Sequence, residues 1–153
     1  MQIEIDQSGK IEETNKDTII AFSNGIKQSV RIHRRTKRRL QETFRTYGKP
    51  RLFRFRVFAC GVYILIKNYL SKINQIVIDT EYIGNEKLIK EMIIEIANSE
   101  PIKNDLRQKI VFKRIGKNSS AHILALSVSR KNIKADKVIG YDELVKIAIK
   151  KSR

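Results

Sequence analysis

Two carboxylates follow a short apolar run within residues 74–82. The run Ile76-Val77-Ile78 is β-branched and has no helical period, which predicts a buried strand. Asp79 and Glu81 stand two residues apart, so both side chains leave the same face of an extended chain. Carboxylates crowded at a strand end repel each other unless a cation lies between them, which points to a divalent metal ion. The alternative is an ordinary solvated strand end that enters a loop.

A third acid lies near the start of the chain, on the first of three predicted antiparallel strands. Alternation of apolar and polar residues predicts these strands. It also directs Asp6 away from the face that carries Ile3 and Ile5. Asn24-Gly25 is typical of a hairpin turn between the second and third strands. The three predicted strands are 3–11, 18–23 and 26–33.

Helical periodicity dominates the rest of the chain, with two further strands between the helices. His122 lies in the first turn of a predicted helix that Ser119 and Ser120 can cap. Residues 53–57 could form a strand, but the apolar content continues past strand length and favours a long helix. The predicted helices are 36–47, 51–73, 86–98, 121–130 and one that begins at Tyr141, and the predicted strands are 74–82 and 108–115.

Positive charge is the strongest feature of the composition. The 153 residues carry a formal net charge of +16, which favours a polyanionic partner, above all nucleic acid. Residues 31–56 hold eleven Lys and Arg residues against one acid, Glu42, and nine of the eleven are Arg. A solvated helix face is the alternative to phosphate binding. The predicted nucleic-acid-binding residues are Arg31, Arg34, Arg35, Lys37, Arg38, Arg39, Arg45, Arg51 and Arg54.

Length and composition favour one domain over residues 1–153 and a soluble, cytoplasmic protein. The longest apolar run, 57–66, is too short to span a bilayer. The start of the chain is acidic and alternating, unlike a signal peptide. The single cysteine, Cys60, cannot form an internal disulfide and is expected to be a small core residue.

The order of predicted elements resembles the ribonuclease H-like superfamily over residues 3–130. The resemblance implies an α/β fold with a five-stranded mixed sheet, three antiparallel strands first, flanked by helices. Asp6, before a Ser-Gly turn, matches the aspartate of the superfamily's first strand, and Asp79 matches the acid at the tip of the fourth, with Glu81 as a competitor. His122 falls where most members carry an aspartate. Argonaute nucleases and some RuvC-type resolvases are similar in using Asp-Asp-His.

The resemblance implies a metal-dependent endonuclease that uses two Mg²⁺ or Mn²⁺ ions about 4 Å apart. Asp6, Asp79, His122 and Glu81 would hold the ions, and Glu42 and Asp136 are further candidates for a fourth ligand. The substrate would be the RNA of RNA/DNA hybrids or branched DNA such as Holliday junctions. A resolvase acts as a dimer, and the apolar region 53–70 could supply a homodimer interface.

Two other functions are compatible with the same sequence. A non-catalytic nucleic-acid-binding protein could keep the fold without turnover, and the histidine at position 122 favours it. A basic ribosome-associated protein would explain charge and size, but not three metal-type residues at strand and helix tips. The enzymatic hypothesis requires Asp6, Asp79 and His122 to meet at one edge of the sheet.

Overall fold

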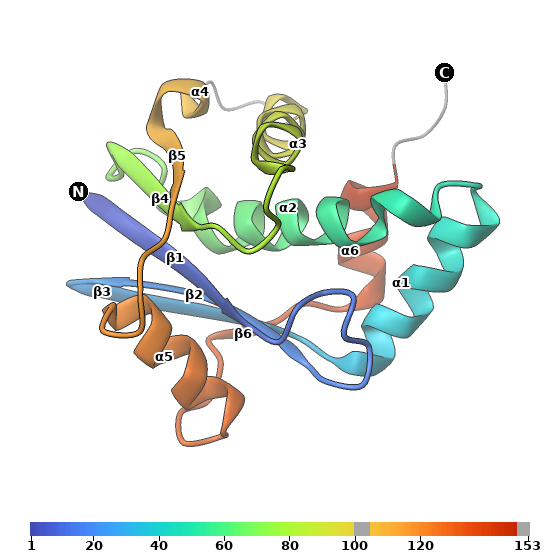
Figure 1. Cartoon of the computed structure of the whole chain (residues 1–153), viewed down its shortest axis with the longest axis horizontal. Coiled ribbons are helices and arrows are strands. Elements are labelled where there is room, and N and C mark those ends of the chain that lie inside the picture. Colours follow the sequence, from blue (N-terminus) through green and yellow to red (C-terminus); the bar gives the residue numbers. More distant parts are fainter. Residues whose placement is uncertain (100–104, 150–153) are drawn as a thin grey trace.

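Six strands form one mixed sheet with helices on both faces in the computed structural model, which describes residues 1–99 and 105–149 (Figure 1). The strand order is β5-β4-β1-β2-β3-β6. The α/β class with a mixed sheet is thereby confirmed. The strands are β1 (Gln2–Ser8), β2 (Thr18–Asn24), β3 (Ile26–Ile32), β4 (Gln75–Asp79), β5 (Ile110–Lys113) and β6 (Lys137–Val138).

The pairing of β1 brings distant parts of the sequence together. β1 runs antiparallel to β2 and parallel to β4, so the carboxyl ends of β1 and β4 share one edge of the sheet. Ile5 of β1 is the partner of Ile78 of β4. Asp6 and Asp79 are the next residues along these strands, so they come to lie on neighbouring strands near that edge.

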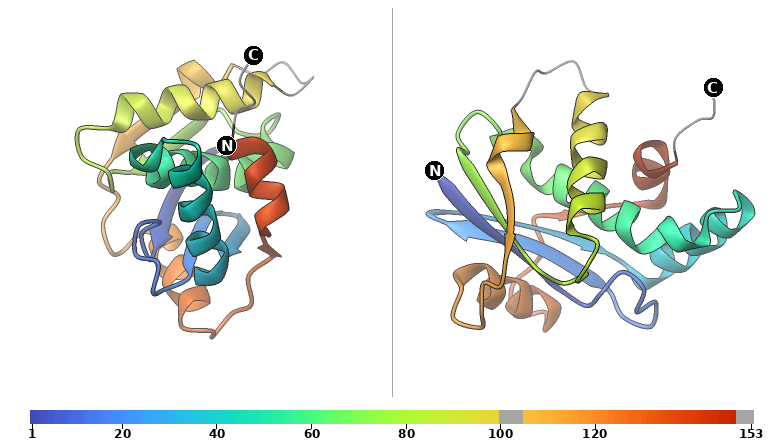
Figure 2. Two further views of the ribbon diagram at one scale, coloured as in Figure 1. Left: turned by 90° about the vertical axis from the view of Figure 1, so that its right-hand side faces the viewer. Right: turned by 45° about the horizontal axis from the view of Figure 1, so that its top comes forward.

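Helices cover the sheet unequally, as Figure 2 shows from two further directions. α2 packs on one face against β2 and β3, and α3 and α6 pack on α2. α5 covers the other face, over β1 and β2. The main helices are α1 (Arg34–Thr46), α2 (Phe53–Ile66), α3 (Glu86–Asn98), α5 (Ser120–Ser129) and α6 (Tyr141–Ala148).

Two hydrophobic clusters follow from this layering. The large core lies between the sheet and α2, and nearly every residue of α2 is buried in it. Gly61 lets α2 approach closely, because a Cβ there would stand 2.5 Å from Cδ1 of Ile20. A smaller cluster joins Ile19 and Ala21 of β2 to α5. This smaller cluster holds α5 against the face of the sheet that Asp6 occupies.

Several element boundaries differ from the sequence prediction. The predicted helix 51–73 is α2 alone, with 3₁₀ turns at Pro50–Leu52 and Lys67–Tyr69 on either side. The predicted strand 108–115 begins as a helical turn, α4 (Leu106–Lys109), and becomes β5 only at Ile110. The first strand ends at Ser8, because Gly9 turns the chain with a φ of +79°.

The prediction of five strands was wrong, since β6 adds a sixth beside β3. β6 has only two residues, too few for alternation to be recognised in the sequence. Its residues Lys137 and Val138 pair with β3 through tertiary contact alone. None of the described helices is long and apolar enough to cross a membrane.

Candidate metal site and basic surface

Three carboxylates meet at the shared edge of β1 and β4. Oxygen atoms of Asp6, Asp79 and Glu81 all lie within 4.8 Å of one another, so this group could hold a metal ion. Asp6 comes from β1 and is 3% exposed, and Asp79 is the last residue of β4. Glu81 follows β4 by two residues and is half-buried. The prediction that Asp6 and Asp79 converge is confirmed in this geometry.

Backbone donors orient the two aspartates. The amide of Gln7 donates to Oδ1 of Asp6 at 2.8 Å, and the amide of Ile115 donates to Oδ1 of Asp79 at 2.9 Å. Such bonds fix the rotation of each carboxylate. One oxygen of Asp6 is therefore held by β1, and one oxygen of Asp79 by the segment after β5.

Burial and mutual repulsion raise the pKa values of Glu81 and Asp6. Burial, a hydrogen bond with Asp79 and the negative charges of Asp79 and Asp6 raise the pKa of Glu81 to about 7. Burial also raises the pKa of Asp6, although bonds from His122 and Gln7 act in the opposite direction. The group therefore holds more negative charge than its surroundings neutralise, and a proton or a cation relieves it.

His122 reaches the same place from α5. Its Nδ1 lies 2.7 Å from Oδ2 of Asp6, on the side away from the Gln7 amide. Ser119 caps α5 by accepting from the Ala121 amide, and its hydroxyl donates to Oε1 of Glu4 at 2.9 Å. Because β1 presents Glu4 and Asp6 on one face, these two contacts seat the start of α5 on that strand.

The structure thus brings only some of the predicted ligands into the group of carboxylates. His122 contacts Asp6 but lies outside the group of three carboxylates, and Glu81, the predicted competitor, lies within it. The other candidate acids lie elsewhere: Glu42 pairs with Arg45 on α1, and Asp136 accepts from the Ser29 amide on β3.

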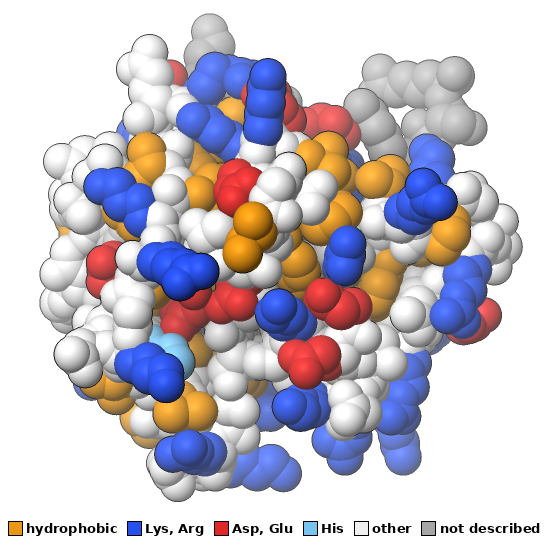
Figure 3. Space-filling view, viewed as in Figure 1, with side chains coloured by type: hydrophobic (Ala, Val, Ile, Leu, Met, Phe, Trp, Pro, Cys, Tyr) orange, Lys and Arg blue, Asp and Glu red, His pale blue; other side chains and the backbone are white. Residues whose placement is uncertain are grey.

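The three acids and His122 line a hollow of about 290 Å³. Arg114 and Lys117, from the segment between β5 and α5, line it as well. Sequence reasoning missed these two cations because they are isolated and lie far from the dense basic stretch. Figure 3 shows acidic side chains gathered near the middle of this face, with a histidine beside them and Lys and Arg side chains around them.

Two of the predicted nucleic-acid-binding residues are buried. Lys37 is fully buried, and its Nζ donates to the carbonyls of Lys10 and Glu13 and to Oγ1 of Thr18. Burial lowers the pKa of Lys37 to about 8. Arg31 is 9% exposed and donates to Asp17 and to the Val128 carbonyl, each at 2.7 Å. Both cations are therefore buried, and their donors bond to the protein itself.

The remaining predicted cations are exposed, on α1, on the 3₁₀ turn before α2 and in the first turn of α2. Arg39 stacks on the ring of Tyr141 at 3.7 Å from its centre, and Arg54 pairs with Glu12 at 3.6 Å. We call this set the α1 basic surface. It consists of Arg34, Arg35, Arg38, Arg39, Arg45, Arg51 and Arg54.

Comparisons of the chain with protein-family models, with curated proteins and with solved structures found no match.

Proposed function

We propose that this chain is a divalent-metal-dependent nuclease with a ribonuclease H-like fold, hydrolysing phosphodiester bonds of RNA/DNA hybrids or branched DNA. The observation that carries the proposal is the meeting of Asp6, Asp79 and Glu81 at one edge of the sheet. The strand order β5-β4-β1-β2-β3, with β1 parallel to β4, supports the fold assignment. The net charge of +16 supports a nucleic-acid substrate.

The donor set fits Mg²⁺ or Mn²⁺. Carboxylate oxygens are the ligands that these hard cations prefer. Asp6, Asp79 and Glu81 would hold them, and the raised pKa of Glu81 indicates that the group needs added positive charge. Divalent ions bound there supply an activated water and stabilise the leaving oxygen of an in-line displacement.

The protein's own residues place and prepare these ligands. His122 holds one oxygen of Asp6, which lowers the pKa of that carboxyl against the effect of burial. Arg114 and Lys117 line the same hollow and would attract the phosphates flanking the bond to be cut. The α1 basic surface would raise the local concentration of a polyanion and hold its backbone.

Asp79→Asn tests the proposal directly. Wild-type protein is incubated with RNA/DNA hybrids and with four-way DNA junctions, in Mn²⁺, in Mg²⁺ and in a chelator. We expect cutting of one substrate that needs the divalent ion, and a loss of roughly a hundredfold or more in Asp79→Asn with binding retained. Asp142→Asn, an exposed acid at the start of α6, is the matched control and should cut as wild type does. Wild type that cuts neither substrate under any of these conditions would overturn the proposal.

A non-catalytic nucleic-acid-binding protein of the same fold is the second candidate. The contact of His122 with Asp6 favours this second candidate. His122 is the fourth side chain at the site, and it bonds a carboxylate instead of adding a fourth carboxylate to the group. Its signature would be salt-sensitive binding that a chelator leaves unchanged, without cutting.

A further inference from the structure

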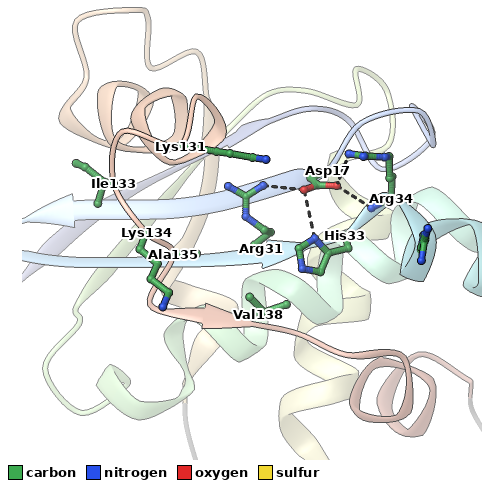
Figure 4. Close-up of a pocket in the computed structure, with 10 residues that line it drawn as sticks. Asp17, Arg31, His33, Arg34, Lys131, Ile133, Lys134, Ala135 and Val138 are labelled. Atoms are coloured by element: carbon green, nitrogen blue, oxygen red, sulfur yellow. Dashed lines mark hydrogen bonds and ion pairs between the residues drawn. The ribbon is translucent and has the colours of Figure 1, made fainter.

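A second hollow lies at the far end of α5 from the three carboxylates, where β3 leads into α1. It measures about 610 Å³, larger than the hollow at the acidic group and within the range of ligand-binding clefts. Figure 4 shows its lining, which comes from the end of β3, the start of α1 and the segment after α5. Five cationic side chains line it against one carboxylate, Asp17, and they are Arg31, Arg34, Arg35, Lys131 and Lys134.

Asp17 fixes the inner wall of this hollow and leaves its positive charge in excess. Its carboxylate accepts from Arg31 at 2.7 Å, from the backbone amide of Arg34 at 2.9 Å, and contacts His33 at 3.3 Å. Burial alone would raise the pKa of Asp17, but these bonds outweigh it and lower the pKa. The same carboxylate lies 3.5 Å from the Arg34 guanidinium, so it pairs with both arginines. The other cations line the hollow with no other lining acid, and they are Arg35, Lys131 and Lys134.

Lys131 occupies a backbone position that usually belongs to glycine. Its φ is +63°, and it is the one non-glycine residue with positive φ in the described part of the chain. The amide of Lys131 donates to the Val128 carbonyl and that of Asn132 to the Ser127 carbonyl, which is the Schellman end of a helix. Glycine adopts this conformation with less strain. A lysine here is therefore unexplained by the fold, and its side chain extends along the hollow toward Arg31 in Figure 4.

A third hollow adjoins the basic one. It measures about 380 Å³ and shares Asp17, Arg31, Arg34 and Lys131 with the larger one. Its lining also includes Ser8, the last residue of β1, and Gly9, which follow Asp6 by two and three residues in the sequence. The basic hollow and the candidate metal site lie toward opposite ends of α5, because Lys131 follows its last residue and His122 lies in its first turn. His122 and Lys131 are separated by nine residues of helix and helix end, about 14 Å.

We propose that the hollow lined by Arg34, Lys131 and Lys134 is a binding site for a backbone phosphate of nucleic acid. The cations would contact the phosphate, and the exposed side chains of Ile133 and Val138, which line the same hollow, would contact the adjoining sugar. The separation of about 14 Å corresponds to roughly four base steps. This role rests on the proposed function: in a nuclease, the site would fix the position of the substrate relative to the bond that is cut.

Lys131→Gly tests this site without threatening the fold, because glycine is favoured at that backbone position. Binding of a labelled RNA/DNA hybrid and of a labelled four-way junction is measured by fluorescence anisotropy in a chelator, over a range of salt concentrations. We expect a loss of about three- to tenfold in affinity and a decrease of about one in the slope of log K against log salt. The melting temperature should stay equal or rise. Lys134→Gln should weaken binding similarly.

Lys146→Gln, an exposed lysine on α6, is the control and should bind as wild type does. Lys131→Gly that binds like this control would overturn the site. Inorganic phosphate, added as a competitor, distinguishes a site for the phosphate of a nucleic-acid backbone from a site for free phosphate. If Lys131→Gly loses phosphate binding but keeps nucleic-acid binding, the hollow is a free-anion site and the backbone assignment is wrong.

Failure of this site and failure of the nuclease proposal give different results. A chain that loses affinity in Lys131→Gly but cuts nothing in Mn²⁺ keeps the phosphate site and loses the nuclease function. A chain that cuts, with cut position and affinity both unchanged in Lys131→Gly, keeps the nuclease function and loses the phosphate site.

Discussion

At the scale of single residues, the candidate metal site is defined by the negative charge of its carboxylates, which the surrounding groups do not fully neutralise. Asp6 and Asp79 each receive a backbone hydrogen bond, and His122 contacts Asp6. Glu81 is the member whose ionisation is most disfavoured, with a pKa raised to about 7 by burial and by the neighbouring acids. Whether Glu81 is protonated should therefore depend on whether a cation is bound at the site.

Glu81→Gln should change how stability depends on pH. Because the pKa of Glu81 is about 7 in the folded chain and near 4.5 in the unfolded chain, the folded state keeps a proton that the unfolded state has lost between these pH values. The wild type should therefore lose stability as pH rises from about 4.5 through about 7, and Glu81→Gln should lose less. Melting temperatures in a chelator, measured across this range, check the expectation. Glu42→Gln, on exposed α1, should follow the wild type.

Mn²⁺ should reverse this loss. Above pH 7, where Glu81 is ionised, added Mn²⁺ is expected to raise the melting temperature of the wild type through preferential binding to the folded state. The rise should be smaller in Glu81→Gln and should shrink for the wild type as pH falls below 7, because protons then compete for the same oxygens. An equal rise in both proteins at every pH would show that Mn²⁺ binds elsewhere.

At the scale of elements, the loop between β1 and β2 joins the acidic group to the basic hollow. It begins at Gly9, whose carbonyl accepts from Oγ1 of Thr18, and the buried Nζ of Lys37 holds two of its carbonyls. It ends at Asp17, on the wall of the basic hollow. These hydrogen bonds therefore fix the path of the loop that carries Asp17.

Gly9→Ala should disrupt this loop far more than a matched change in the β2–β3 turn. A Cβ at Gly9 would stand 2.3 Å from the Asp17 carbonyl oxygen, and φ is +79°. We expect a loss of about 3 kcal/mol in the free energy of unfolding, from strain and the backbone clash together. Gly25→Ala has nearly the same φ, +76°, and open space around it, so about 1 kcal/mol is expected. Urea unfolding of both variants would contradict this reasoning if the two losses were equal.

At the scale of the whole molecule, positive charge surrounds a small negative centre. The net charge of +16 should attract nucleic acid, and the three acids should repel it at the site itself until cations are bound. Exposed cations of the α1 basic surface would contribute to this attraction through released counterions. Buried Arg31 and Lys37 would contribute less directly, because their donors are already engaged by the protein.

Arg38→Gln should lower the salt dependence of nucleic-acid binding. Arg38 is exposed on α1, and loss of one phosphate contact should reduce the slope of log K against log salt by about one. Lys87→Gln, exposed on α3 and outside the α1 basic surface, should leave the slope unchanged. Binding curves at four or five salt concentrations measure both, and equal slopes for the two variants would contradict a specific role for α1.

The sequence alone determined the kinds of element and the residues that could do chemistry. Periodicity predicted α3, α5 and the opening strands, because each has a repeated apolar pattern long enough to recognise. A short β-branched run without helical period predicted β4. Four residues could also be named as candidate ligands, because acids and histidine are metal-ligating residue types and these lie near predicted strand or helix ends: Asp6, Asp79, Glu81 and His122. The dense basic stretch was equally visible.

Tertiary structure decided which of these residues meet and which are buried. Parallel pairing of β1 with β4 joined Asp6 to Asp79, and the chain direction after β4 brought Glu81 into the group. The packing of α5 on β1 placed His122 against Asp6. Packing also turned Lys37 and Arg31 inward. Local sequence cannot specify such features, because contacts between residues far apart in the chain create them.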